Sequence, residues 1–146
     1  MAAWAIERHP IRAVINAGLR EAEDLAGLLG VPAAAVRPLR QAADGTWLPP
    51  AAGTALDAVA TMAVVVHVLR GARSPAQAMK HAVGLGGDTD TAAAIIGGIL
   101  GCQSATVERE IPWLSKVALP DSESIEAVAI GLYRLRRLLR PSAPSR

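Results

Sequence analysis

Apolar and polar residues recur along most of this chain with the period of an amphipathic α-helix. Over residues 10–29, apolar side chains return every three or four positions, and arginines and acids fall between them. Such spacing places the apolar side chains on one face of a helix. Pro10 suits a helix start and Gly30 a helix stop. The pattern predicts a helix from Pro10 to Leu29 with its charged face in solvent.

Similar signals predict further helices. The segment 32–43 is expected to be helical, with Pro38 interrupting it or ending its first part. Thr54 and Asp57 resemble a capping box, and the helix that they open runs to about Arg70. That helix is apolar nearly all round, so we expect it to be central and buried. The remaining helices are expected over about 74–83, 88–100, 104–110 and 121–139.

Composition favours the packing of helices over sheets. The 146 residues are 51% hydrophobic and 19% charged, contain no Phe, and are only 3% aromatic. A core of such a chain must consist of Ala, Leu, Val and Ile, which suits closely packed helices. We predict a single all-α domain over 1–140, followed by a loose tail over 141–146.

The charge and the cysteine content limit which binding partners and which cellular compartment we expect. The net charge of +2 offers no argument for binding to nucleic acid. The lone Cys102 cannot form an internal disulfide, which fits a reducing, cytoplasmic location. The best candidate membrane segments, about 54–69 and about 92–102, are shorter than the roughly 20 residues that a bilayer requires. We therefore expect neither nucleic acid nor a membrane as a partner.

One stretch carries polar chemistry inside an apolar segment. Residues 86–98 read GGDTDTAAAIIGG, so two carboxylates and two hydroxyls occupy four consecutive positions. Burying an unpaired charge costs several kcal/mol, roughly, even after relaxation. We therefore expect a positively charged group to meet these side chains.

Helix geometry constrains how these groups can meet a cation. Helix residues two apart point about 200° apart, so Asp88 and Asp90 cannot both face one ion from a regular helix. Gly86 and Gly87 permit a tight turn. We place Asp88 at or before the N-cap, with Asp90 and Thr91 in the first helical turn. Carboxylate and hydroxyl oxygens are hard ligands that suit magnesium, manganese or calcium.

Two other interpretations stay open. Aspartate and threonine are good N-caps, and acids in a first turn gain from the helix dipole, so the segment could serve capping alone. Alternatively, Gly86 and Gly87 before a helix start could cradle a phosphate of a substrate. Because two carboxylates would repel a phosphate, the cradle also requires a cation between them.

At this point the sequence resembles a known family. Gly86 to Thr91, followed by a small-residue helix, is similar to the C-terminal signature of the ADP-ribosylglycohydrolases, which include the dinitrogenase reductase activating glycohydrolases. The apolar segment 54–70, the segment 74–83 and the run Ile111-Pro112-Trp113-Leu114 also resemble segments of that family. The resemblance covers roughly residues 45–140.

The resemblance implies a compact all-α fold with a binuclear magnesium (or manganese) site. It assigns Asp88, Asp90 and Thr91 as metal ligands. The substrate would be an ADP-ribosylated protein or a small ADP-ribose conjugate, whose glycosidic linkage is hydrolysed. The family's N-terminal Thr-Asp-Asp motif does not occur in this chain. The resemblance is therefore to the C-terminal half, and a complementing N-terminal-half chain is an expected partner.

Some assignments stay open at this stage. No catalytic acid or base is identifiable, and the alternative to an enzyme is a non-catalytic remnant or a binding subunit of the same fold. Trp47 either covers the core or stacks on an adenine, and His67 is expected to be a core histidine. His81 could assist acid–base chemistry. Asn16 could reach a ligand, but the sequence does not separate that role from a surface amide.

Overall fold

The chain is all-helical wherever its structure is described. A computed structural model describes residues 1, 5, 7–51, 53, 56–103, 107–118 and 122–139. These residues form α-helices and one 3₁₀ helix, and no strand occurs among them, which confirms the predicted all-α class. Their contacts group the chain into two compact units, Met1–Pro112 and Trp113–Arg146. A single domain over 1–140 stays a prediction, and the tail over 141–146 lies outside the described residues.

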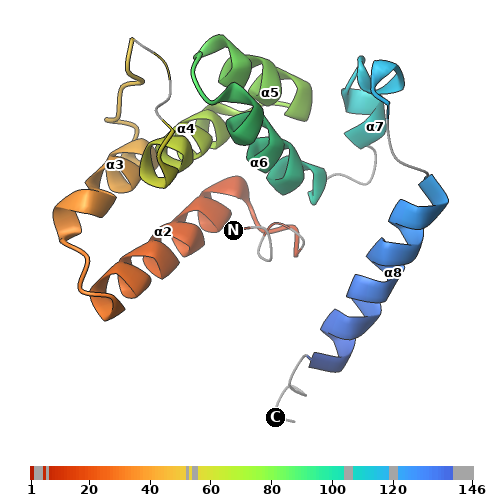
Figure 1. The fold of residues 1–146 in the computed structure, drawn as a ribbon, viewed down its shortest axis with the longest axis horizontal. Coiled ribbons are helices and arrows are strands. Elements are labelled where there is room, and N and C mark those ends of the chain that lie inside the picture. The colour runs from red at the N-terminus through yellow and green to blue at the C-terminus, as the bar shows by residue number, and fades with distance from the viewer. Residues whose placement is uncertain are drawn as a thin grey trace. The chain divides into compact units, whose positions relative to one another are not determined.

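The first unit holds most of the helices. Figure 1 shows their succession along the chain. The helices predicted over 10–29, 74–83 and 88–100 agree with the structure within three residues at each end. The described helices of this unit are α2 (Ile11–Leu28), α3 (Ala33–Asp44), α4 (Ala58–Gly71), α5 (Pro75–Gly84), α6 (Thr89–Gly101) and α7 (Val107–Glu110).

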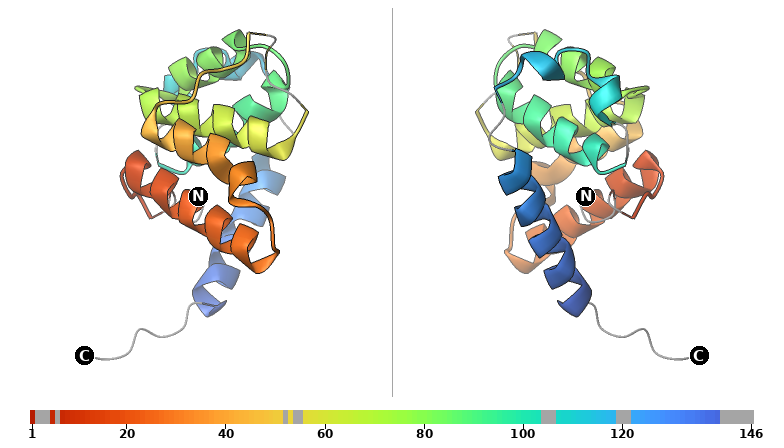
Figure 2. Two further views of the ribbon diagram at one scale, coloured as in Figure 1. Left: turned by 90° about the vertical axis from the view of Figure 1, so that its left-hand side faces the viewer. Right: turned by 90° about the vertical axis from the view of Figure 1, so that its right-hand side faces the viewer.

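Helix α4 is the centre of this unit, as its apolar sequence predicts. It packs against α2, α3, α5 and α6, and it lies between α3 and the α5–α6 pair in Figure 2. Valine is a poorer helix former than alanine by roughly 0.5 kcal/mol per residue. Burial outweighs that cost here, because each fully buried aliphatic side chain stabilises the fold by about 1.5–3 kcal/mol. The residues buried in α4 are Thr61, Ala63, Val64, Val65, Val66, Val68 and Leu69.

Two predicted helix boundaries are wrong. Pro38 lies inside α3 without ending it. A proline removes one backbone donor, and α3 continues beyond it because Leu39 and Ala42 pack on the core. Helix α4 begins at Ala58 and not at the predicted Thr54, which lies outside the described residues. Asp57 is its N-cap, so aspartate occupies the capping position that we assigned to threonine.

The second unit holds η1 (Leu114–Lys116) and α8 (Ser122–Leu139). The predicted last helix is therefore confirmed over its described length. Much of its apolar stripe is solvent-exposed, including Ile125, Val128, Leu132 and Leu135. Across the described parts of both units, the helices lack the combined length and apolarity that crossing a bilayer requires.

Candidate functional site

The signature segment forms the turn between α5 and α6. Gly86 and Gly87 have φ values of +75° and +77°, a left-handed conformation that strains any residue with a side chain. The Gly86 N–H donates a hydrogen bond to the Val83 carbonyl (3.2 Å), and the Thr89 N–H donates to the Gly87 carbonyl (2.8 Å). The two glycines thus form the turn that follows α5 and leads into α6.

Gly53 packs its backbone against this turn, a contact that sequence reasoning missed. Its φ is +86°, and a Cβ built on it would lie 2.7 Å from the Gly87 nitrogen and 2.8 Å from the Gly86 carbonyl carbon. Backbone therefore packs directly on backbone at this point. The sequence marked Gly53 only as part of a loop, because no local pattern signals a contact between residues so far apart in the chain.

The structure places the acidic side chains of the signature where the sequence predicted. Asp88 is the N-cap of α6, with φ −73° and ψ 64°, and Asp90 and Thr91 lie in the first turn. The expectation of buried charge is wrong, however. Asp90 and Thr91 are exposed and Asp88 is half-buried. Since water solvates these groups, no counter-charge is needed merely to tolerate them.

Asp88 does not cap its own helix. Its side chain forms no capping hydrogen bond with the first turn of α6. By contrast, the hydroxyl of Ser74 accepts a hydrogen bond from the Gln77 N–H (3.2 Å) at the start of α5. An N-cap oxygen normally satisfies one of the free N–H groups of the first turn. Capping alone therefore does not account for the Asp88 carboxylate.

The carboxyl groups of Asp88 and Asp90 lie close enough to interact. The pKa of Asp90 is lowered, chiefly by a hydrogen bond from the Thr91 backbone N–H, then by a side-chain hydrogen bond with Asp88 and by its own backbone N–H. These contacts favour the ionised form. The first turn of α6 thus brings the two carboxyl groups together and keeps Asp90 charged.

A cavity of about 350 Å³ lies between the starts of α4 and α6. Asp88 and Thr91 stand on one side, and Asp57 on the other. The Asp57 carboxylate already accepts hydrogen bonds from the backbone N–H groups of Val59 (2.9 Å) and Ala60 (3.0 Å). The floor is mainly apolar, and the lining residues among those that the structure describes are Leu56, Asp57, Ala58, Thr61, Met62, Asp88, Thr91 and Ile95.

This donor set fits a hard divalent cation. The Asp88 carboxylate makes no capping hydrogen bond, and the Asp90 carboxyl group interacts with it. Thr91 adds a hydroxyl at the cavity that Asp88 lines. Among the described residues, no three His, Cys, Asp or Glu side chains converge on one point. The set is therefore two carboxylates and a hydroxyl, which suits Mg²⁺, since that ion commonly binds one or two carboxylates and retains several waters.

Three other candidate side chains, Trp47 after α3, His67 on α4 and His81 on α5, form a row of rings. The Trp47 and His67 ring centroids are 5.6 Å apart, and those of His67 and His81 are 5.8 Å apart. His67 is half-buried on α4 between these two rings, and its assignment as a core histidine stays a prediction. Burial, then His81, then Arg70 lower its pKa. The Trp47 and His67 rings meet at an interplanar angle of 62°, and adenine stacking by Trp47 stays a prediction.

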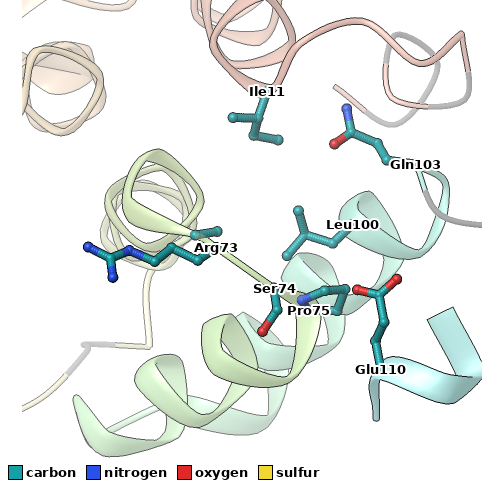
Figure 3. A pocket seen from close by; sticks show the side chains of 8 residues that line it. Ile11, Arg73, Ser74, Pro75, Leu100, Gln103 and Glu110 are labelled. Atoms are coloured by element: carbon teal, nitrogen blue, oxygen red, sulfur yellow. The ribbon is translucent and has the colours of Figure 1, made fainter.

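A second cavity, of about 280 Å³, is drawn in Figure 3. Polar residues of its lining form hydrogen bonds within the fold. The Ser74 hydroxyl caps α5, and the Gln103 amide donates to the His9 carbonyl (2.6 Å). Arg73 points its guanidinium away from Leu100, which lies near the middle of the lining (Figure 3). The remaining lining residues are Ile11, Ala72, Pro75 and Glu110. None of the predicted site residues lines it.

Comparison with known proteins defines the class of the protein. The chain belongs to the ADP-ribosylglycohydrolase family, whose sequence profile matches residues 1–142. The match therefore also includes the first 44 residues, outside the range of about 45–140 over which the sequence showed its resemblance. No curated protein and no solved structure matches the chain. Membership connects this chain with a family of hydrolases and agrees with its helical fold.

Proposed function

We propose that this chain supplies Asp88, Asp90 and Thr91 to a binuclear magnesium (or manganese) site that hydrolyses ADP-ribosyl glycosidic linkages. The substrate is an ADP-ribosylated protein or a small ADP-ribose conjugate. Family membership supports the reaction class. The observation that carries the site is that the Asp88 carboxylate makes no capping bond, interacts with Asp90, and lines an open cavity together with Thr91.

The chain's own residues have distinct tasks in this proposal. Asp88 and Asp90 hold the cation, and the Thr91 hydroxyl adds a neutral oxygen. When bound, the cation supplies Lewis acidity and a template for water and sugar hydroxyls. Aspartate is ionised at neutral pH, and the lowered pKa of Asp90 keeps its carboxylate ionised to more acidic pH as well. The exposed Gly87 and its neighbour Gly86 are the proposed substrate contacts beside the ligands.

Glycoside hydrolysis also requires groups that this chain has not been shown to supply. The reaction passes through an oxocarbenium-like state and commonly uses a carboxyl group for proton transfer. The family's Thr-Asp-Asp motif is absent from the sequence. We therefore include in the proposal a complementing N-terminal-half chain that brings the remaining ligands and the proton donor.

The second candidate function is a non-catalytic binding subunit of the same fold. The described residues contain no convergent group of three His, Cys, Asp or Glu, which favours this alternative. A binding subunit would retain affinity for a divalent ion or for ADP-ribose but would not turn substrate over with any partner.

Metal titration tests the site first. Titration calorimetry with MnCl₂ and MgCl₂ compares the wild type with Asp88→Asn, Asp90→Asn and the double variant. Loss of ligands should weaken binding by at least about tenfold. The exposed Asp24 on α2 supplies the matched control, since Asp24→Asn removes the same charge away from the cavity. Equal affinity in the double variant and the wild type would remove the metal assignment.

Activity measurements then separate the two candidate functions. ADP-ribosylated arginine and serine peptides are incubated with the wild type or the double variant, with and without a candidate N-terminal-half chain. Release of ADP-ribose that requires both Asp88 and Asp90 supports the hydrolase. Metal binding without release under any of these combinations supports the binding subunit.

A further inference from the structure

A third cavity lies at the far end of α4 from the signature turn. Its volume is about 280 Å³, close to the lower limit of about 300–1,000 Å³ typical of small-molecule sites. Asp57 caps the first turn of α4, whereas Arg70 lies in its last turn and lines this cavity. The lining comes from α2, α3 and α4 and comprises Arg12, Ile15, Asn16, Ala43, Asp44 and Arg70.

Two guanidinium groups converge here from different helices. Arg12 and Asn16 are four residues apart on α2, so they share one face of that helix. Arg70 approaches from α4 and lies against the left-handed C-cap of α3, where a side chain in place of Gly45 would collide with its guanidinium. The fold thus arranges two arginines and an amide around one polar space.

Among the described residues, neither the Arg12 nor the Arg70 side chain forms an ion pair or a hydrogen bond. The ion pairs among those residues join Glu7 to His9 and Glu23 to Arg40. Arg70 does lower the pKa of His67 through its charge. The guanidinium donors that face the cavity are therefore available to a ligand.

We propose that this cavity binds a small phosphate ester that carries a hydroxyl group. Arginine pairs with phosphate through parallel N–H donors, and Arg12, Arg70 and the Asn16 amide present such donors together. Asp44 lines the same cavity and would repel a bare phosphate. Its carboxylate accepts a hydrogen bond from the ligand's hydroxyl, so it selects hydroxylated esters. This site is independent of the proposed metal centre.

Calorimetry with a matched pair of ligands tests the proposal. Glycerol 3-phosphate and propyl phosphate share a chain and a phosphate, and only the first carries hydroxyls. At low ionic strength, where screening is weakest, the wild type should bind glycerol 3-phosphate at least about tenfold more tightly than propyl phosphate. Arg12→Gln and Arg70→Gln should each reduce that affinity by about tenfold. Arg20→Gln, an exposed arginine on α2 outside the lining, should leave it unchanged.

Asp44→Asn should change the affinities for the two ligands unequally. Propyl phosphate should bind more tightly because the repulsion is removed, and the preference for glycerol 3-phosphate should shrink severalfold. The absence of binding by the folded wild type, or equal losses in Arg20→Gln and Arg70→Gln, would overturn the proposal. Circular dichroism establishes that each variant is folded. Retention of binding by the Asp88→Asn and Asp90→Asn double variant would show that this site does not depend on the metal centre.

Discussion

The starts of α4 and α6 place the same residue type in the same position with different consequences. Asp57 and Asp88 are both N-caps, and both line the cavity between these helices. The Asp57 carboxylate accepts two backbone hydrogen bonds from its own first turn, whereas the Asp88 side chain accepts none. The Asp57 carboxylate therefore stabilises its helix by capping, and the Asp88 carboxylate does not.

The backbone conformation of each aspartate explains the difference. Asp57 has an extended conformation (φ −131°, ψ 146°), which directs its side chain over the following N–H groups. Asp88 follows two left-handed glycines and has φ −73° and ψ 64°. Whether an N-cap aspartate caps its helix thus depends on its own backbone conformation. Its presence in the sequence does not decide between the two roles.

The largest expected effect comes from breaking the contact between Gly53 and the Gly86–Gly87 turn. Gly53→Ala adds a Cβ 2.7 Å from the Gly87 nitrogen and forces a positive φ on alanine. We expect a loss of about 2–3 kcal/mol in the free energy of unfolding, measured by urea denaturation. Gly98→Ala is the control, because its Cβ meets open space in α6, and it should be neutral or stabilising by up to about 1 kcal/mol. Equal stability of the two variants would contradict the packing described for Gly53.

An intermediate effect should distinguish the two aspartates directly. Asp57→Ala removes two capping hydrogen bonds and should cost about 1 kcal/mol of unfolding free energy. Asp88→Ala removes no capping bond and should cost only a few tenths of a kcal/mol, roughly. Asp57→Asn retains a capping side chain and serves as the control. If Asp88→Ala destabilises as much as Asp57→Ala, Asp88 caps α6 in solution.

The smallest effect concerns the pH dependence of the α6 start. The pKa of Asp90 is lowered from 3.8, so the folded state binds fewer protons than the unfolded state below that value. The contribution of Asp90 to stability is complete above pH 3.8 and is lost as the pH falls through its lower folded pKa. Urea denaturation between about pH 2.5 and 5 should show the stability difference between wild type and Asp90→Asn shrinking on acidification. A pH-independent difference would contradict the shift.

Much of the fold could be predicted because its signals are local. Ser74 with Pro75 indicates the start of α5, Gly30 indicates the end of α2, and the apolar run of α4 indicates burial. The order of Asp88, Asp90 and Thr91 around a helix start followed from the helical repeat and the two glycines. The start of α4 was placed too early because Thr54 and Asp57 are both plausible caps in the sequence, and the structure shows the Asp57 side chain capping the first turn.

The sequence by itself determined the helical class, the family signature and the hard-oxygen character of the candidate site, because these depend on residue type and on spacing within one helix or turn. Only the tertiary structure decided that Asp90 is exposed, that Gly53 packs on Gly87, and that Arg12 and Arg70 face one cavity. Exposure and long-range contact arise from how helices distant in the chain pack together, and no periodicity within a single segment encodes that arrangement.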